Sequence, residues 1–174
     1  QIGNNNSNNT NNTVNNNQSF NINVFLNEEC KDAMNMSDFI KSIQVSLEQL
    51  DYTTSNGLEK GITKVIMENM RKLSVNERPI HCTDTKRDTL YIKDDDKWEK
   101  DRDKSKIKYA IKKASSKNYE ALSNWTAENP DFMQSDDKQR FYAHSISKLG
   151  KPICDIEDKI IKTICNNTYI KDDL

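Results

Sequence analysis

The stretch Arg78–Asp101, RPIHCTDTKRDTLYIKDDDKWEKD, decides the fold, because it holds the only convincing strand signals in the sequence. Within it, Thr89–Ile92 is rich in β-branched and aromatic residues and alternates in polarity, as half-buried strands do. Asp94–Asp96 then indicates a turn, because aspartate side chains form hydrogen bonds with their own backbone. We therefore predict a β-hairpin that pairs residues 89–93 with residues 97–99.

A third strand is predicted over residues 79–82, where a short apolar run follows Pro79. Proline can begin a strand but cannot occupy its middle, because it lacks the backbone N–H. A hairpin alone is only marginally stable in water. The helices on either side of this stretch must therefore cover its apolar face.

Two amphipathic helices are predicted before the strand region, over residues 36–50 and 58–73, with a turn over 52–57 between them. In each helix, apolar residues recur at steps of three and four, which places them on one face. Gly61 lies inside the second helix, where it costs about 1 kcal/mol relative to alanine. Its presence there indicates close packing against a neighbouring segment.

After the strand region, a long and highly charged helix is predicted over residues 100–127, with a bend at Ser115–Ser116 where its apolar stripe weakens. Pro130 ends this segment, because the residue before a proline avoids the helical conformation. Shorter helices are predicted over residues 135–149 and from residue 155 onward. Their narrow apolar stripes are typical of helices that pack against other helices or other subunits.

The N-terminal segment, residues 1–18, is a low-complexity tract dominated by asparagine. It leads into SFNINVFL, residues 19–26, whose alternating polarity predicts a strand, and a short helix is predicted over residues 28–34. Asparagine side chains can stack as ladders between parallel chains. We therefore expect an oligomeric stalk whose axis is lined by four apolar residues: Val14, Phe20, Ile22 and Val24. The alternative is a flexible linker, because the tract has almost nothing apolar to bury.

These patterns together predict an α+β fold that is mainly helical. We expect an Asn-rich stalk and strand over residues 1–27, a helix–helix–β-hairpin domain over 28–101, and a charged C-terminal helical region over 102–174. The stalk and the narrow stripes favour a parallel homo-oligomer with coiled-coil packing, a trimer before a dimer.

The composition limits the classes of function. Of 174 residues, 34% are apolar and 30% are charged, which is a poor supply for a large globular core. The net charge of −1 argues against non-specific nucleic-acid binding by the chain as a whole. No apolar run approaches the roughly 18 residues of a membrane span, so no membrane partner is expected. The four cysteines show no close pairing, which favours free thiols in an intracellular protein.

The sequence has no phosphate-binding loop, dinucleotide fingerprint, HExxH motif or nucleophile elbow. The adjacent His81 and Cys82 are candidates for a nucleophile or a pair of metal ligands, with Cys30 as a further ligand. Zinc sites usually have two pairs of closely spaced ligands, however, and neighbouring strand residues point to opposite faces. Asp94–Asp96 lacks the glycine and the distal glutamate of a calcium loop. We therefore expect no enzymatic activity, no metal and no cofactor.

The best nucleic-acid signal is the segment Lys97–Lys117, which carries nine Lys and Arg residues against three acidic ones. Helical spacing places several of its lysines one turn apart in a basic stripe, and Trp98 and Tyr109 are interleaved with them. We take four lysines as candidate contacts: Lys104, Lys108, Lys112 and Lys113. The alternative is an ordinary solvated helix face, which the nearly neutral charge of the whole chain favours.

A resemblance to a known group of proteins rests on the Asn-rich tract and on two further blocks, NINVFLNEECKDAMNMSDFIKSIQ and RPIHCTDTKRDTLYIKDDDKWEK. In these blocks, within about the first two thirds of the chain, the sequence resembles a group of Asn-rich proteins encoded by large nucleocytoplasmic DNA viruses of algae and amoebae. Members of this group often carry a Cys/His zinc finger before the Asn-rich tract. This sequence shows none and begins at Gln1 rather than Met, which fits a zinc finger upstream.

The resemblance implies no enzymatic activity and supplies no catalytic residues. It implies an intracellular location, in the infected cell, the viral factory or the virion. The sequence therefore favours a non-enzymatic, oligomerising viral interaction or structural protein, with other viral proteins as partners. The alternative is a nucleic-acid-binding adaptor that uses Lys97–Lys117 or an upstream zinc finger. An enzyme with a His81–Cys82 centre is the third hypothesis.

Overall fold

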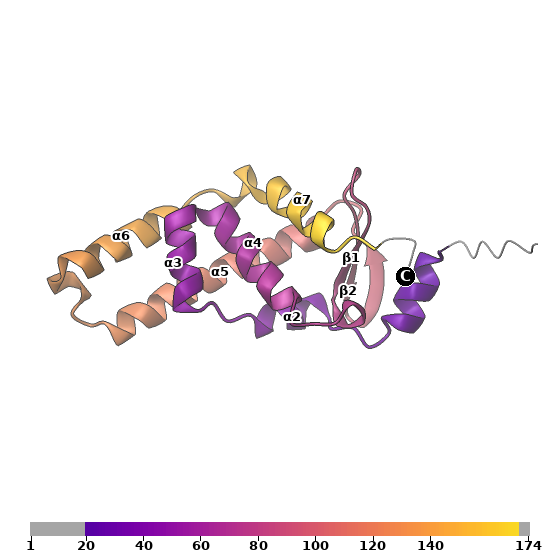
Figure 1. Cartoon of the computed structure of the whole chain (residues 1–174), viewed down its shortest axis with the longest axis horizontal. Helices are drawn as coiled ribbons and strands as arrows, with labels where there is room; N and C mark the ends of the chain where they lie inside the picture. Colours follow the sequence, from indigo (N-terminus) through magenta and orange to yellow (C-terminus); the bar gives the residue numbers. More distant parts are fainter. Residues whose placement is uncertain (1–19, 171–174) are drawn as a thin grey trace, which may run out of the picture.

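The computed structural model describes residues 20–170, so the predicted stalk over residues 1–18, with Val14, lies outside the described residues. Within the described range the chain is mainly helical and has one small antiparallel sheet, which confirms the predicted α+β class. The helices form an elongated bundle, and the sheet stands across one end of it (Figure 1).

The elements follow the chain in a simple order, helices first, then the sheet, then helices again. They are α1 (Ile22–Val24), the π-helical turn η1 (Phe25–Glu29), α2 (Met36–Ser42), α3 (Leu47–Asn56), α4 (Leu58–Met70), η2 (Val75–Glu77), β1 (Ile80–Asp84), β2 (Thr89–Asp94), β3 (Lys97–Lys100), α5 (Ser105–Glu128), η3 (Phe132–Gln134), α6 (Asp136–Leu149), η4 (Ile153–Asp155) and α7 (Glu157–Asn167).

The three strands are antiparallel in the order β1–β2–β3. In the tight turn between β2 and β3, Asp95 and Asp96 have φ values of 48° and 59°. Two successive residues with positive φ give a hairpin turn that matches the twist of its strands, and aspartate tolerates this conformation better than most residues. The predicted hairpin and the predicted third strand are confirmed.

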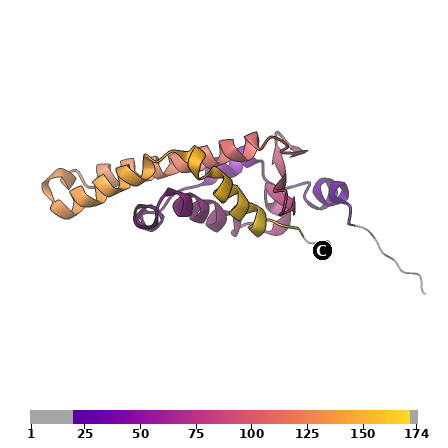
Figure 2. The same cartoon turned by 90° about the horizontal axis from the view of Figure 1, so that it is seen from above.

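Both faces of the sheet are buried, because alternate residues of each strand point to opposite sides. One face packs on the helix bundle through four side chains that have no exposed surface: Ile80, Cys82, Leu90 and Ile92. The other face carries His81, Tyr91 and Trp98, and the helical segment 22–29 covers it. Figures 1 and 2 show this segment on the far side of the sheet from the bundle.

The bundle has one continuous core that includes the inner face of the sheet. α5 crosses this core and contacts α2, α3, α4, α6 and α7. Its apolar stripe, which includes Ile107, Ile111 and Ala114, is fully buried. After α7, the chain pairs with β1 through two backbone hydrogen bonds of 2.9 Å. The N–H of Cys82 donates to the carbonyl of Thr168, and the N–H of Ile170 donates to the carbonyl of Cys82.

The strand predicted over residues 19–26 is wrong, because residues 22–29 are helical. The Asn21 side chain caps this helix by accepting hydrogen bonds from the backbone N–H groups of Asn23 and Val24, at 3.0 and 3.4 Å. Phe25 and Leu26 then lie together on the face that packs on the sheet. Tertiary packing on the sheet therefore overrides the local alternation of apolar residues.

Three predicted helix boundaries are also wrong. The helix predicted over 36–50 is two helices, because α3 begins at a capping box in which Ser46 and Gln49 exchange hydrogen bonds of 3.1 and 3.2 Å. The turn predicted over 52–57 is helical as far as Asn56. The helix predicted over 28–34 ends at Glu29 as a π-helical turn.

The bend predicted at Ser115–Ser116 is absent, and α5 continues unbroken through both residues. Ser115 is buried in the helix interface, and the Ser116 hydroxyl donates to the carbonyl of Lys113 within the same helix. Small polar residues therefore continue the packing stripe here without interrupting the helix.

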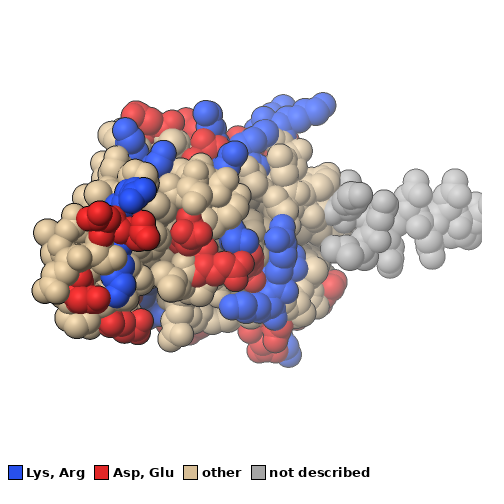
Figure 3. Space-filling model, turned by 60° about the vertical axis from the view of Figure 1, so that its left-hand side comes forward, with Lys and Arg blue, Asp and Glu red and all other residues tan. Residues whose placement is uncertain are grey.

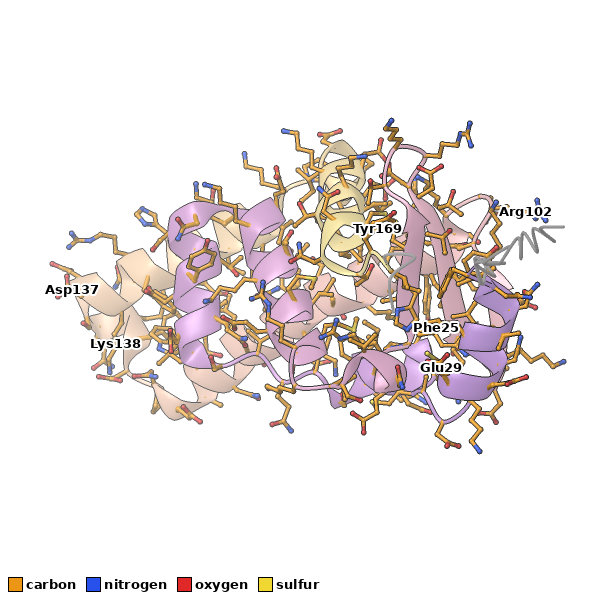
Figure 4. The ribbon with its side chains drawn as sticks, turned by 45° about the vertical axis from the view of Figure 1, so that its right-hand side comes forward. Phe25, Glu29, Arg102, Asp137, Lys138 and Tyr169 are labelled. Carbon is orange, nitrogen blue, oxygen red and sulfur yellow. The ribbon has the colours of Figure 1, made fainter. Side chains whose placement is uncertain are left out.

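At the end of the bundle away from the sheet, α5 and α6 form a helical hairpin (Figure 1). Aromatic rings join its two helices, with 4.8 Å between the ring centroids of Trp125 and Phe141. The first turn of α6, with Asp137 and Lys138, lies at the outer end of this hairpin (Figure 4). Trp125 is therefore a packing residue.

Replacing Gly61 by alanine should destabilise the protein, because a Cβ atom at this position of α4 would lie 2.1 Å from the Thr53 hydroxyl of α3. We expect the free energy of unfolding to fall by about 1–3 kcal/mol, the usual cost of overpacking a core. Urea denaturation followed by circular dichroism measures this change. Lys60→Ala, on the exposed side of the same helix, is the matched control and should change stability by less than about 0.5 kcal/mol.

Candidate functional site

The N-terminus of α5 is fixed by a buried carboxylate that comes directly after β3. The two oxygens of Asp101 accept hydrogen bonds from the backbone N–H groups of Lys106 and Ile107, at 3.2 and 2.9 Å. These are two of the four N–H groups that lack a partner within a helix. Lys104 links the strand to the helix in a left-handed conformation, with φ of 61°. The position of α5 is therefore tied to the edge of the sheet.

The exposed face of α5 is basic along its first half. Between Ser105 and Lys117 the helix carries five lysines and no acidic residue. On the face shown in Figure 3, by contrast, basic and acidic side chains are interspersed. Two large aromatic side chains also lie on the exposed side of α5, since Tyr109 is 61% exposed and Tyr119 is 43% exposed.

One pocket lies between α2 and α5, and we refer to it as the α2–α5 pocket. Its volume is about 480 Å³. Met36, Ile40 and Ala110 give it an apolar floor, and Asp94 and Tyr109 also line it. Four lysines from both helices stand around it, Lys41, Lys106, Lys113 and Lys117, together with the carboxylate of Glu120. An apolar floor with cationic groups around it suits a flat, partly apolar and anionic ligand.

A second pocket, of about 520 Å³, lies between α5 and the segment around η4, and we refer to it as the α5–η4 pocket. Lys108, Lys112 and Lys151 supply its positive charge, and Tyr119 adds an aromatic wall. Tyr109 lines this pocket as well as the α2–α5 pocket. The two pockets therefore flank one exposed ring on α5.

Several of the lysines already have carboxylate partners. Lys106 lies 2.7 Å from Glu99, and Lys108 lies 2.6 Å from Glu157. These carboxylates, through hydrogen bonds, raise the pKa of both lysines. Lys117 pairs with Glu120 at 3.2 Å.

Two neighbouring lysines on α5 are not paired in this way. Among the residues from 20 to 170, no carboxylate lies within 4.0 Å of the ammonium groups of Lys112 and Lys113. The Lys113 ammonium instead lies 5.3 Å from the centroid of the Tyr109 ring. This pair of lysines is therefore the part of the face best able to accept an anionic partner.

The four lysines predicted as contacts are separated by the structure into different environments. Lys113 lines the α2–α5 pocket, whereas Lys108 and Lys112 line the α5–η4 pocket. Lys104 lines neither and lies 3.6 Å from Asp88. Lys41 and Lys151 also line these pockets and were not predicted, because nothing local in the sequence shows that their segments lie beside α5.

His81 and Cys82, the residues of the enzyme hypothesis, point to opposite faces of the sheet. His81 faces the N-terminal helix and lies 3.7 Å from the Cys30 sulfur, measured from Nε2 to Sγ, whereas Cys82 faces the bundle. Burial, with the charge of Glu29, raises the pKa of Cys30 to about 11. Burial, with the charge of Arg78, lowers the pKa of His81 to about 4. Both groups are therefore neutral at pH 7, which does not favour a thiolate nucleophile.

Cys82 meets a different thiol on the inner face of the sheet. The thiol of Cys165 on α7 is its neighbour there, and both side chains are fully buried. The interaction with Cys82, together with burial, raises the pKa of Cys165. Among residues 20–170 no cluster of three or more His, Cys, Asp or Glu side chains is placed to hold a metal ion.

Of the residues predicted to line an oligomer axis, the structure describes Phe20, Ile22 and Val24, which lie on the N-terminal helical segment or just before it. Phe20 and Ile22 pack against the small cluster on the outer face of the sheet, and the Phe20 ring lies 5.7 Å from Phe25. Val24 is 43% exposed. Figure 4 shows Phe25 between this segment and the sheet. Two of the three described residues are thus engaged within their own chain.

Comparison with known proteins adds no relative. No family model, no curated protein and no solved structure matches this chain. The resemblance to viral Asn-rich proteins stays a prediction. In the part of the chain that the structure describes, no helix combines the length and the apolar character needed to cross a membrane.

The buried His81 should make stability depend on pH. Its pKa is about 4 in the folded protein and near 6.5 when unfolded. Between these values the unfolded state binds the extra proton, so the free energy of unfolding falls as the pH decreases. We expect a loss of about 2 kcal/mol from pH 7 to pH 5, measured by urea denaturation. His81→Asn should flatten this dependence, whereas the exposed His144→Asn should retain it; equal slopes in both variants would contradict the assignment.

Removing the cap of α5 should also destabilise the protein. We expect Asp101→Ala to lower the free energy of unfolding by about 1–2 kcal/mol, because two helix N–H groups lose their acceptor. Thermal or urea denaturation measures the loss. Asp51→Ala, at an exposed position of α3, is the control and should have little effect.

Proposed function

We propose that this protein is a non-enzymatic binding protein that holds nucleic acid against the exposed face of α5. The observation that carries the proposal is the pair Lys112 and Lys113, which have no carboxylate partner among residues 20–170 and lie beside the exposed ring of Tyr109. Lysines supply the sequence-independent attraction to phosphates, and exposed aromatic rings supply surfaces on which bases stack.

The existing ion pairs on this face do not prevent binding. The pairs Lys106–Glu99 and Lys108–Glu157 are partly exposed, and such surface ion pairs contribute only about 0–1 kcal/mol each. A phosphate backbone presents a row of negative charges, so it can exchange with a single carboxylate partner. Because the net charge of the whole chain is −1, the attraction is confined to this face and should depend strongly on salt.

The non-enzymatic part of the proposal is supported by the state of the buried titratable groups. The Cys30 thiol and the His81 imidazole are both neutral at pH 7, and they lie beneath the N-terminal helical segment. Homo-oligomerisation and a viral context stay predictions from the sequence, because the Asn-rich tract lies outside the described residues. The α5 face is preferred here because its residues are exposed, charged and grouped around two pockets.

Neutralising the two unpartnered lysines tests the proposal. We expect Lys112→Gln/Lys113→Gln to weaken the binding of a fluorescein-labelled single-stranded 20-mer by roughly tenfold at low salt. The slope of log K against log salt should become shallower by about 1.4, since each phosphate contact on a single strand contributes about 0.7. Fluorescence anisotropy over a series of salt concentrations measures both quantities.

The control removes two positive charges elsewhere. Lys60→Gln/Lys86→Gln changes exposed lysines of α4 and of the β1–β2 loop, and should leave the slope unchanged. If wild type binds no nucleic acid at low salt, or if both double variants lose affinity equally, the α5 face is not the binding site.

A further inference from the structure

Tyr109 occupies an unusual position among the aromatic side chains. It lies on the exposed face of α5, near the N-terminal end of the helix, and both pockets reach it. With 61% of its surface exposed, it adds little to the stability of the fold. The Lys113 ammonium lies 5.3 Å from the centroid of its ring. An aromatic ring presented in this way, with a cation beside it, is suited to stacking on a flat ligand.

The α2–α5 pocket has the chemistry of a site for one nucleobase. Its volume of about 480 Å³ falls in the range of pockets that hold small ligands. Met36, Ile40 and Ala110 form a floor on which an apolar ring face can lie. The ring of Tyr109 forms part of the wall.

Charge in the pocket sets the direction in which such a ligand would lie. The carboxylate of Asp94 is a hydrogen-bond acceptor, so it disfavours a phosphate beside it and can accept from the amino or imino groups of a base. Asp94 already accepts a hydrogen bond of 3.2 Å from the backbone of Ser37, which holds it in place. The lysines of this pocket, Lys113 among them, are the groups that can take the phosphate.

We propose that the nucleic acid bound at the α5 face is single-stranded, and that one unstacked base enters the α2–α5 pocket beside Tyr109. This inference rests on the proposed function. A duplex keeps its bases stacked and paired inside the helix, whereas a single strand can turn bases outward onto aromatic side chains. The strand crosses α5 at Tyr109, and its next base reaches the α5–η4 pocket, where Tyr119 and Lys112 stand.

The test compares four polyanions on the full chain by fluorescence anisotropy at one salt concentration. They are a 20-mer single-stranded DNA, a single-stranded RNA of the same length, a DNA duplex of the same length and inorganic polyphosphate. We expect both single strands to bind at least roughly tenfold more tightly than the duplex and the polyphosphate, because stacking adds to charge attraction only for unpaired bases. A difference between DNA and RNA would identify which of the two is the partner.

Substitution of Tyr109 separates stacking from charge. We expect Tyr109→Ala to weaken single-strand binding by roughly tenfold, while Tyr109→Phe stays within about twofold of wild type, because the ring remains. Duplex and polyphosphate affinities should not change. Tyr169→Ala is the control, since this exposed side chain lines neither pocket. A single strand that carries 2-aminopurine should also show quenching with wild type and with Tyr109→Phe, but not with Tyr109→Ala.

The outcomes distinguish the two proposals. If none of the four polyanions binds, the proposed function itself fails. If duplex and polyphosphate bind as tightly as the single strands and Tyr109→Ala binds like wild type, the face is a non-specific anion surface and the single-strand inference is overturned. Because Tyr109 is exposed, circular dichroism should confirm that its variants are folded. Tyr119→Ala provides a second, independent test at the α5–η4 pocket.

Discussion

The burial of the small sheet on both faces is the constraint on which the rest of this structure depends. In this three-stranded sheet both faces carry apolar or aromatic side chains, and both must be covered for the sheet to be stable. The bundle covers one face, where Leu90 and Ile92 lie, and the N-terminal helical segment covers the other. Two hydrogen bonds from β2 tie down the chain directly after that segment, since the Lys93 ammonium donates to the carbonyls of Lys31 and Ala33 at 2.5 and 2.9 Å.

The same arrangement fixes the helix that carries the candidate site. Strand β3 leads directly to the buried Asp101, whose carboxylate holds the first turn of α5. The inner stripe of α5, with Ile107 and Ile111, then packs between the other helices. Rotation of α5 about its axis is prevented by this packing, and so the lysines and Tyr109 must face outward. The exposed basic face is thus a consequence of how the opposite face is buried.

Partial pairing of charge on this face has a physical advantage. The glutamates beside Lys106 and Lys108 offset the charge of these lysines, and the whole chain is nearly neutral, so its non-specific attraction to anionic surfaces is weak. Lys112 and Lys113 lack such partners among the described residues, which leaves a local centre of attraction at the ring of Tyr109. On such a face, affinity for an anionic ligand comes from charge. Discrimination between ligands comes from the shape and polarity of the pockets.

The sequence by itself determined the elements that are specified locally. The turn aspartates and the β-branched residues of 89–92 gave the hairpin, and the three- and four-residue spacing gave most of the helices, because neighbouring residues alone produce these patterns. It also located the basic segment. Tertiary structure decided the rest: residues 22–29 became a helix because the outer face of the sheet required cover, and Lys41 and Lys151 joined the lysines of α5 because α2 and the segment before η4 pack beside it. Contacts between segments far apart in the chain depend on the packing of the whole core, which no local pattern encodes.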